Sequence, residues 1–97
     1  MYNKITEGVL QIVAGDIEKL LLEQREGIAG VFEKMFTGGV KVTITAEFRP
    51  SSNGVATEYS LSYPLEPKPE PALKQTVKFK HTINEDQAEI FDEAENG

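Results

Sequence analysis

The stretch GGVKVTITAEFR, residues 38–49, decides the fold. After its two glycines, apolar side chains alternate strictly with polar ones from Val40 to Arg49, which is the period of a strand that buries one face. Before them, from Ile5 to Phe36, apolar residues recur every three or four positions, as in an amphipathic helix. The sequence therefore predicts an α+β domain, in which an N-terminal helix or helix pair covers one face of a three-stranded antiparallel sheet.

The helical half is predicted over residues 4–37. Asn3 is the expected N-cap, and Gly38-Gly39 is the expected stop, with one of the two glycines at positive φ. Gly15-Asp16 falls inside the apolar stripe. A single helix of more than 30 residues would be long for so small a domain, so we favour two helices divided at Gly15-Asp16 over one continuous helix.

The sheet half is predicted over residues 40–83. Its first two strands, Val40–Arg49 and Val55–Tyr63, form a hairpin around PSSNG, residues 50–54, where Asn-Gly supplies positive φ. The Pro-rich connection 64–72 follows, because proline lacks the N–H that a helix or a central strand needs. The third strand ends at residue 83, and it directs Leu73, Gln75, Val77, Phe79, His81 and Ile83 toward the core.

Charge divides the chain into a domain and a tail. The net charge is −6, and residues 84–97 alone carry six acidic groups and no basic one. Residues 1–83 are neutral in sum and form the single predicted domain, while the acidic tail 84–97 is expected to be disordered. A chain with this balance lacks the positive field that general nucleic-acid binding requires, so such binding is disfavoured.

Composition excludes several other classes. The chain contains no cysteine, which removes disulfides, thiolate nucleophiles and thiolate metal sites. The beginning MYNKITEGVLQIV lacks the apolar core of a signal peptide, and no apolar run approaches the length of a membrane span. We expect a cytoplasmic protein, in the host cytoplasm if it is encoded by a phage, with no membrane partner.

Groups that could carry catalysis are scarce. His81 is the only histidine, and it lies in phase with core residues, so we expect a partly buried histidine with one hydrogen bond. The acidic residues of the tail lack the spacing of a calcium loop. We therefore expect no catalytic residue, no metal site and no cofactor, and we expect that the protein is not an enzyme.

The outer face of the sheet is a candidate binding face. The alternation places basic side chains on it at Lys41, Arg49, Lys74, Lys78 and Lys80. One interpretation is an ordinary solvated face whose lysines also protect an edge strand. The other is a docking surface for an acidic partner, either nucleic acid or the chain's own acidic tail, although the face offers no aromatic side chain for base stacking.

Self-association is the other candidate activity. The run Leu20-Leu21-Leu22 covers more of the helix circumference than one sheet face needs, and a second copy would bury the surplus. Gly27 and Gly30 weaken the helix by roughly 1 kcal/mol each relative to Ala. They are either tolerated surface glycines or places of close backbone packing, against the sheet or a second copy. These five positions predict a homodimer.

The sheet half also resembles a family of small phage and prophage proteins of uncharacterised function. The resemblance covers about half of the chain and consists of a Gly-Lys-Val-Thr-type strand, an Arg-Pro turn, a Pro-rich connection and a Thr-x-x-Phe strand. It implies a phage origin and an accessory role in recombination, packaging or countering host defence, and it brings no catalytic residue. The residues that carry it are Gly39, Lys41, Val42, Thr43, Ile44, Phe48, Arg49-Pro50, Gly54, Pro64, Thr76 and Phe79.

The sequence thus predicts a non-enzymatic phage or prophage accessory protein that acts through an unidentified protein partner or through self-association. The alternative is a nucleic-acid-associated accessory protein that uses the Lys-rich outer face.

Overall fold

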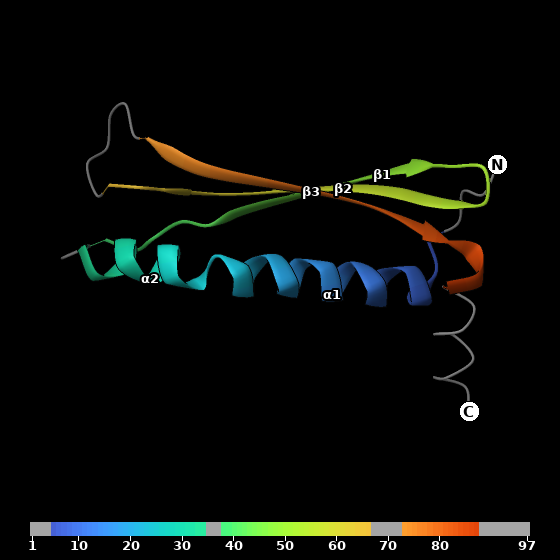
Figure 1. Ribbon diagram of the computed structural model, residues 1–97, viewed down its shortest axis with the longest axis horizontal. Helices are drawn as coiled ribbons and strands as arrows, with labels where there is room; N and C mark the ends of the chain where they lie inside the picture. The colour runs from blue at the N-terminus through green and yellow to red at the C-terminus, as the bar shows by residue number, and fades with distance from the viewer. Residues whose placement is uncertain (1–4, 35–37, 67–72, 88–97) are drawn as a thin grey trace.

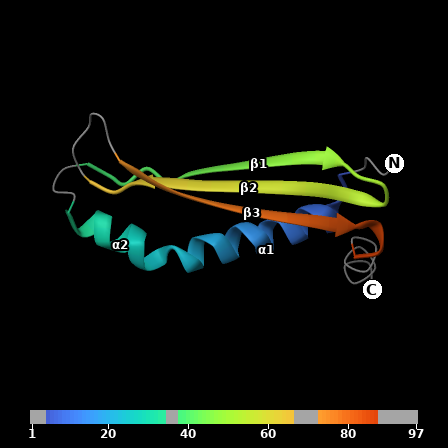
Figure 2. The ribbon, with the colours of Figure 1, turned by 45° about the horizontal axis from the view of Figure 1, so that its top comes forward.

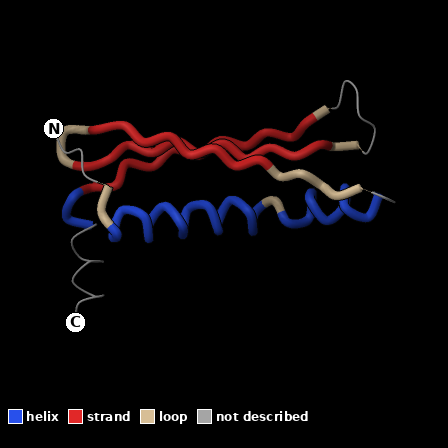
Figure 3. The backbone as a smooth tube through the Cα atoms, turned by 180° about the vertical axis from the view of Figure 1, so that it is seen from behind, coloured by secondary structure: helices blue, strands red, loops and turns tan. Residues whose placement is uncertain are grey.

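The fold has two layers, a helical layer and a three-stranded sheet (Figure 1). The computed structural model describes residues 5–34, 38–66 and 73–87. Within them the chain forms α1 (Glu7–Glu23), α2 (Arg25–Lys34), β1 (Thr43–Pro50), β2 (Gly54–Pro64) and β3 (Lys74–Asn84). Both helices lie on the same side of the sheet (Figure 3). The predicted α+β class, with helices first and an antiparallel sheet after, is confirmed.

The sheet is an antiparallel meander with the order β1-β2-β3. Ala46 of β1 pairs with Tyr59 of β2, and Tyr59 pairs with Phe79 of β3. The predicted hairpin is present, although Pro50 ends β1 instead of opening the turn. Each predicted strand differs from the observed one by one to three residues at its ends. The sheet is built as the alternation indicated, with one face toward the helices.

Gly54 departs from its predicted role. Its φ is not in the left-handed region, and it is the first residue of β2. A Cβ atom there would overlap the carbonyl oxygen of Ile83 on the neighbouring strand, so glycine is required by close approach of two backbones. The prediction that this glycine supplies positive φ to the turn was therefore wrong.

The helical half is indeed two helices, but they divide at Gln24. Gly15-Asp16 lies inside α1, where an exposed glycine costs only about 1 kcal/mol and does not end a helix. At Gln24 the backbone turns away from helical geometry, with φ −102° and ψ 6°, and α2 resumes at the next residue. The expected division at Gly15-Asp16 was wrong, because both residues lie within α1 and the helical half divides nine residues after Gly15.

The ends of the helical half also differ from expectation. Thr6 is the N-cap of α1, and its hydroxyl accepts a hydrogen bond of 3.2 Å from the Val9 N–H. The proposed cap Asn3 lies outside the described residues. At the other end the described part of α2 reaches Lys34, and neither Gly38 nor Gly39 has a φ in the left-handed region. The two glycines therefore lead into the sheet without forming the predicted left-handed cap.

The core is thin and lies between α1, α2 and the middle of the sheet. Its largest fully buried side chains come from α1 and from the strands β2 and β3: Tyr59, Leu61, Ile83, Val9 and Val55. Leu73, predicted to face the core, is 65% exposed, because it precedes β3 at the far end of the sheet. Only the first part of the Pro-rich connection is described, and the acidic tail is described only through Gln87.

Candidate functional site

The helices do not cover the sheet evenly. α1 packs mainly against β2 and β3, and β1 lies farthest from the helices (Figure 2). The ammonium group of Lys19 stands 5.5 Å from the centre of the Phe79 ring, so that side of α1 faces β3. Leu10, Ile17 and Leu21 lie on the opposite side of α1, since successive residues are turned by about 100°. These three residues therefore line the β1 side of the helix.

Together with the inner face of β1, that side of α1 forms one open surface, called here the apolar face. It consists of Leu10, Ile17 and Leu21 from α1 and of Ile44, Ala46 and Phe48 from β1. Leu10 is 48% exposed, Leu21 37% and Phe48 39%, and the other three are half-buried. At the end of this surface near the hairpin turn there is a hollow of about 210 Å³, lined by Ile5, Phe48, Arg49, Pro50 and Val55. Exposed apolar side chains concentrated in this way are typical of interaction surfaces.

The structure separates the residues that predicted self-association. Leu20 is buried in the core, Leu21 belongs to the apolar face, and Leu22 is exposed on the side of α1 turned away from the sheet. Gly27 lies directly against the Tyr63 hydroxyl, where a Cβ atom would overlap it, so this glycine serves packing on the sheet. Gly30 has open space around the position of a Cβ atom. Leu21, Leu22 and Gly27 are exposed and Gly30 is half-buried, so Leu20 is the one of the five that is closed to a second copy.

The predicted basic face lies on the side of the sheet away from the helices. Lys41, Arg49, Lys74, Lys78 and Lys80 are all exposed there. The guanidinium of Arg49 donates a hydrogen bond of 2.8 Å to the carboxylate of Glu47 on the same strand. Glu58 stands opposite Lys80 in the register of β2 and β3. Acidic residues therefore reduce the positive charge in the middle of this face.

The two ends of the basic face differ. One hollow of about 190 Å³ lies around Ala56 and is lined by Arg49, Lys80 and the acidic Glu58, among others. A second hollow of about 140 Å³ lies near the start of β1 and is lined by Lys41, Thr43, Ser62, Tyr63, Pro64 and Lys74. The second hollow combines the ammonium groups of Lys41 and Lys74 with the hydroxyl groups of Thr43 and Ser62, because the Tyr63 hydroxyl is directed to Gln24 in the helical layer. Its lining contains no acidic residue. It is the more suitable of the two for an anionic group.

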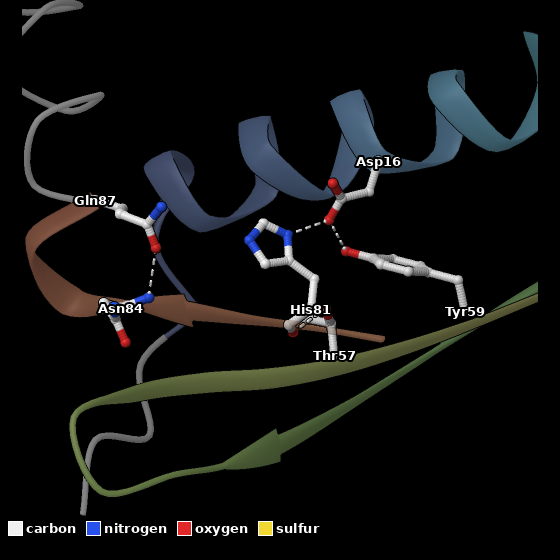
Figure 4. Close-up of polar contacts among 6 residues, drawn as sticks. All are labelled: Asp16, Thr57, Tyr59, His81, Asn84 and Gln87. Atoms are coloured by element: carbon white, nitrogen blue, oxygen red, sulfur yellow. Dashed lines mark hydrogen bonds and ion pairs between the residues drawn. The ribbon is translucent and has the colours of Figure 1, made fainter. Parts of the chain in front are cut away.

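A polar cluster of Asp16, Tyr59 and His81 joins α1 to the sheet (Figure 4). One carboxylate oxygen of Asp16 accepts hydrogen bonds of 2.8 Å from the Tyr59 hydroxyl and of 2.8 Å from Nδ1 of His81. The Asp16 side chain is 13% exposed and that of His81 is 30% exposed. Thr57 supports the arrangement from β2, because its hydroxyl donates a 2.6 Å bond to the carbonyl of His81. The predicted partly buried histidine is confirmed.

The Tyr59 side chain is fully buried, and this changes its ionisation. Burial raises the pKa of Tyr59 to about 12, and the nearby Asp16 carboxylate acts in the same direction. A carboxylate that orients an imidazole through Nδ1 can also serve proton transfer, but that chemistry needs a reacting group at Nε2. Among the described residues, Asp16 is the one hydrogen-bond partner of the His81 ring. The bonds of Asp16 to Tyr59 and His81 fasten α1 to β2 and β3, so the cluster joins the two layers.

Sequence reasoning overlooked the pairing of Asp16 with His81 and the exposure of Leu10 and Phe48. Asp16 lies seven residues after Val9 and four before Leu20, so the helical period places its carboxylate on the buried side of α1. A charged residue and a histidine, both in phase with the core, are a signal that the two pair with each other. The exposure of Phe48 had no such signal, because alternation shows which face a side chain takes and not whether anything covers that face.

None of the described helices is both long enough and apolar enough to cross a membrane. Within residues 5–34, 38–66 and 73–87, no group of three or more histidine and acidic side chains is arranged to hold a metal ion.

Comparison with known protein families, with curated proteins and with solved structures gives no match to this chain.

Proposed function

We propose that this protein is a non-enzymatic accessory protein, of phage or prophage origin, that acts through protein–protein contact and associates first with a second copy of itself. The observation that supports self-association is the apolar face. Leu10, Leu21 and Phe48 leave a third to a half of their surface in water, beside an inner strand face that the helices cover only in part. Association would remove this surface from water and supplement a thin core.

The proposal is tested by the mass of the protein in solution, measured by light scattering over a wide range of concentrations. We expect a dimer for the wild type. Leu21→Lys and Phe48→Lys each place a charge within the apolar face, so both variants should be monomers. Leu22→Lys is the matched control, because Leu22 is exposed on α1 but lies outside the apolar face. It should remain a dimer.

Circular dichroism establishes that each variant is folded before its mass is interpreted. A wild-type protein that stays monomeric at millimolar concentration would refute the proposal. Equal loss of the dimer in Leu22→Lys and Leu21→Lys would also refute it, because the contact would then not depend on the apolar face.

A second candidate function uses the basic face. The hollow between Lys41 and Lys74, with its two hydroxyl groups, favours an anionic group such as a nucleic-acid phosphate. Binding to DNA should then weaken steeply as salt rises, and Lys41→Ala with Lys74→Ala should weaken it more than Lys78→Ala with Lys80→Ala. Equal loss in the two double variants would contradict a site at this hollow.

A further inference from the structure

The two edges of the sheet are protected differently. β3 carries Lys74, Lys78 and Lys80 along its free edge, and lysines of this kind discourage pairing with another strand. β1 carries no lysine, and its two charged residues, Glu47 and Arg49, form an ion pair with each other. β1 also borders the apolar face, whereas β3 is covered by α1. The β1 edge is therefore the one that can receive a further strand.

The direction of the backbone groups on β1 follows from the turn. The Ser51 N–H donates a 3.0 Å hydrogen bond to the Gly54 carbonyl, so Ser51 points toward β2. Because the direction alternates along an antiparallel strand, Ile44, Ala46, Phe48 and Pro50 direct their backbone groups to the free edge. The backbone nitrogen of Pro50 faces the free edge, so its missing N–H does not affect the pairing of β1 with β2. Ile44, Ala46 and Phe48 thus offer three N–H and three carbonyl groups to a partner strand.

We propose that β1 pairs antiparallel with β1 of a second copy about a twofold axis at Ala46, which joins the two sheets into one of six strands. This inference rests on the self-association proposed above. In this register Ile44 stands opposite Phe48 of the second copy, and the backbone groups of Ile44, Ala46 and Phe48 form about six hydrogen bonds. Since a twofold axis perpendicular to the sheet preserves its faces, both apolar faces lie on the same side of the joined sheet and adjoin each other.

Charge selects this register over its two neighbours. With the axis at Glu47, two glutamates of the two copies would stand directly opposite each other, and like charges in that position are destabilising. With the axis at Thr45, Lys41 would stand opposite Arg49 of the second copy. With the axis at Ala46, Glu47 faces Thr45 and Arg49 faces Thr43, so no like charges meet.

Cysteine cross-linking tests the register directly, because the chain has no cysteine of its own. Thr45 and Glu47 lie on the basic face, away from the core, and the proposed register places Thr45 opposite Glu47 of the second copy as a closely spaced pair without mutual hydrogen bonds. Thr45→Cys and Glu47→Cys are purified separately, mixed and oxidised, and the products are identified by mass spectrometry. We expect the mixed disulfide as the main cross-linked product, with neither variant cross-linking to itself.

Proline substitution provides a second test that requires no oxidation. Ala46→Pro removes an N–H that points to the free edge of β1, and it should abolish the dimer without breaking the pairing of β1 with β2. Lys78→Pro is the matched control on the free edge of β3. The Glu85 N–H donates to the Asn53 carbonyl, which by alternation directs the Lys78 N–H outward as well. We expect Lys78→Pro to remain a dimer.

The outcomes separate this inference from the function on which it rests. A self-disulfide of Thr45→Cys or of Glu47→Cys in place of the mixed product would overturn the register. A wild-type dimer with no cross-linking, and with an Ala46→Pro variant that still dimerises, would overturn pairing through β1 while leaving self-association in place. A monomeric wild type would overturn both.

Discussion

The hydroxyl of Tyr59 should make the stability of the protein depend on pH in a way that Tyr59→Phe removes. At pH 8 the hydroxyl donates to the Asp16 carboxylate inside the core. A hydrogen bond to a charged acceptor contributes about 1.5–3 kcal/mol, and Asp16 keeps its bond from His81 when the hydroxyl is absent. We therefore expect Tyr59→Phe to lower the free energy of unfolding at pH 8 by about 1–2 kcal/mol.

The sign reverses at high pH. The pKa of Tyr59 is about 12 in the folded protein and 10.0 in the unfolded chain. Between these values the unfolded chain loses a proton that the folded protein keeps, so the wild type becomes less stable as pH rises. Each pH unit corresponds to about 1.4 kcal/mol, and the full interval to as much as about 2.7 kcal/mol. Tyr59→Phe has no such loss, so near pH 12 it should equal or exceed the wild type in stability.

The measurement is urea unfolding of both proteins, followed by circular dichroism, at intervals from pH 8 to pH 12. All other titratable groups are common to both proteins, so the difference in free energy of unfolding isolates Tyr59. A difference that stays constant across the whole range would refute the reasoning, because it would mean that burial does not hold the proton on Tyr59.

Three further substitutions test the packing of the helices, each measured by urea or thermal unfolding. Gly27→Ala should destabilise the protein by about 1–3 kcal/mol because the new methyl group overlaps the Tyr63 hydroxyl, and a neutral result would show that Tyr63 moves aside freely. Gly30→Ala meets open space and should stabilise α2 by up to about 1 kcal/mol; a loss of stability would argue against the described position of Gly30. Thr6→Ala should cost about 1 kcal/mol through the lost bond to the Val9 N–H, whereas an unchanged melting temperature would mean that Thr6 does not cap α1.

The helices and strands of this fold could be predicted from the sequence because apolar residues recur at a regular interval in each. The alternation from Val40 to Arg49 predicted a strand with one inner face, and the helical period before Gly38 predicted the layer that covers the sheet. The position at which the two helices divide could not be predicted in this way. The low helix propensity of Gly15 suggested that the helix ends there. However, Asp16 is held in α1 by hydrogen bonds to Tyr59 and His81, which lie 43 and 65 positions later in the sequence.

The candidate surfaces were predicted only in part. The five basic residues do share the outer face, as alternation required. The apolar face could not be derived in the same way, because it depends on where α1 lies across the sheet. That position is set by contacts such as Lys19 with Phe79, and no local pattern records it. The spacing of apolar residues thus predicted which face of a helix or strand each residue lies on. The long-range contacts decided which of these faces remain exposed to solvent.

The fastening of α1 through Asp16 has a consequence for the order of folding. The strands are consecutive in the sequence, so the sheet can form by closing short loops, whereas the bond between Asp16 and His81 closes a separation of 65 residues. We expect the meander to assemble first and the helical layer to dock onto it in a later step. The helices should then open and exchange their amide hydrogens with solvent more readily than β2, whose backbone is bonded on both sides.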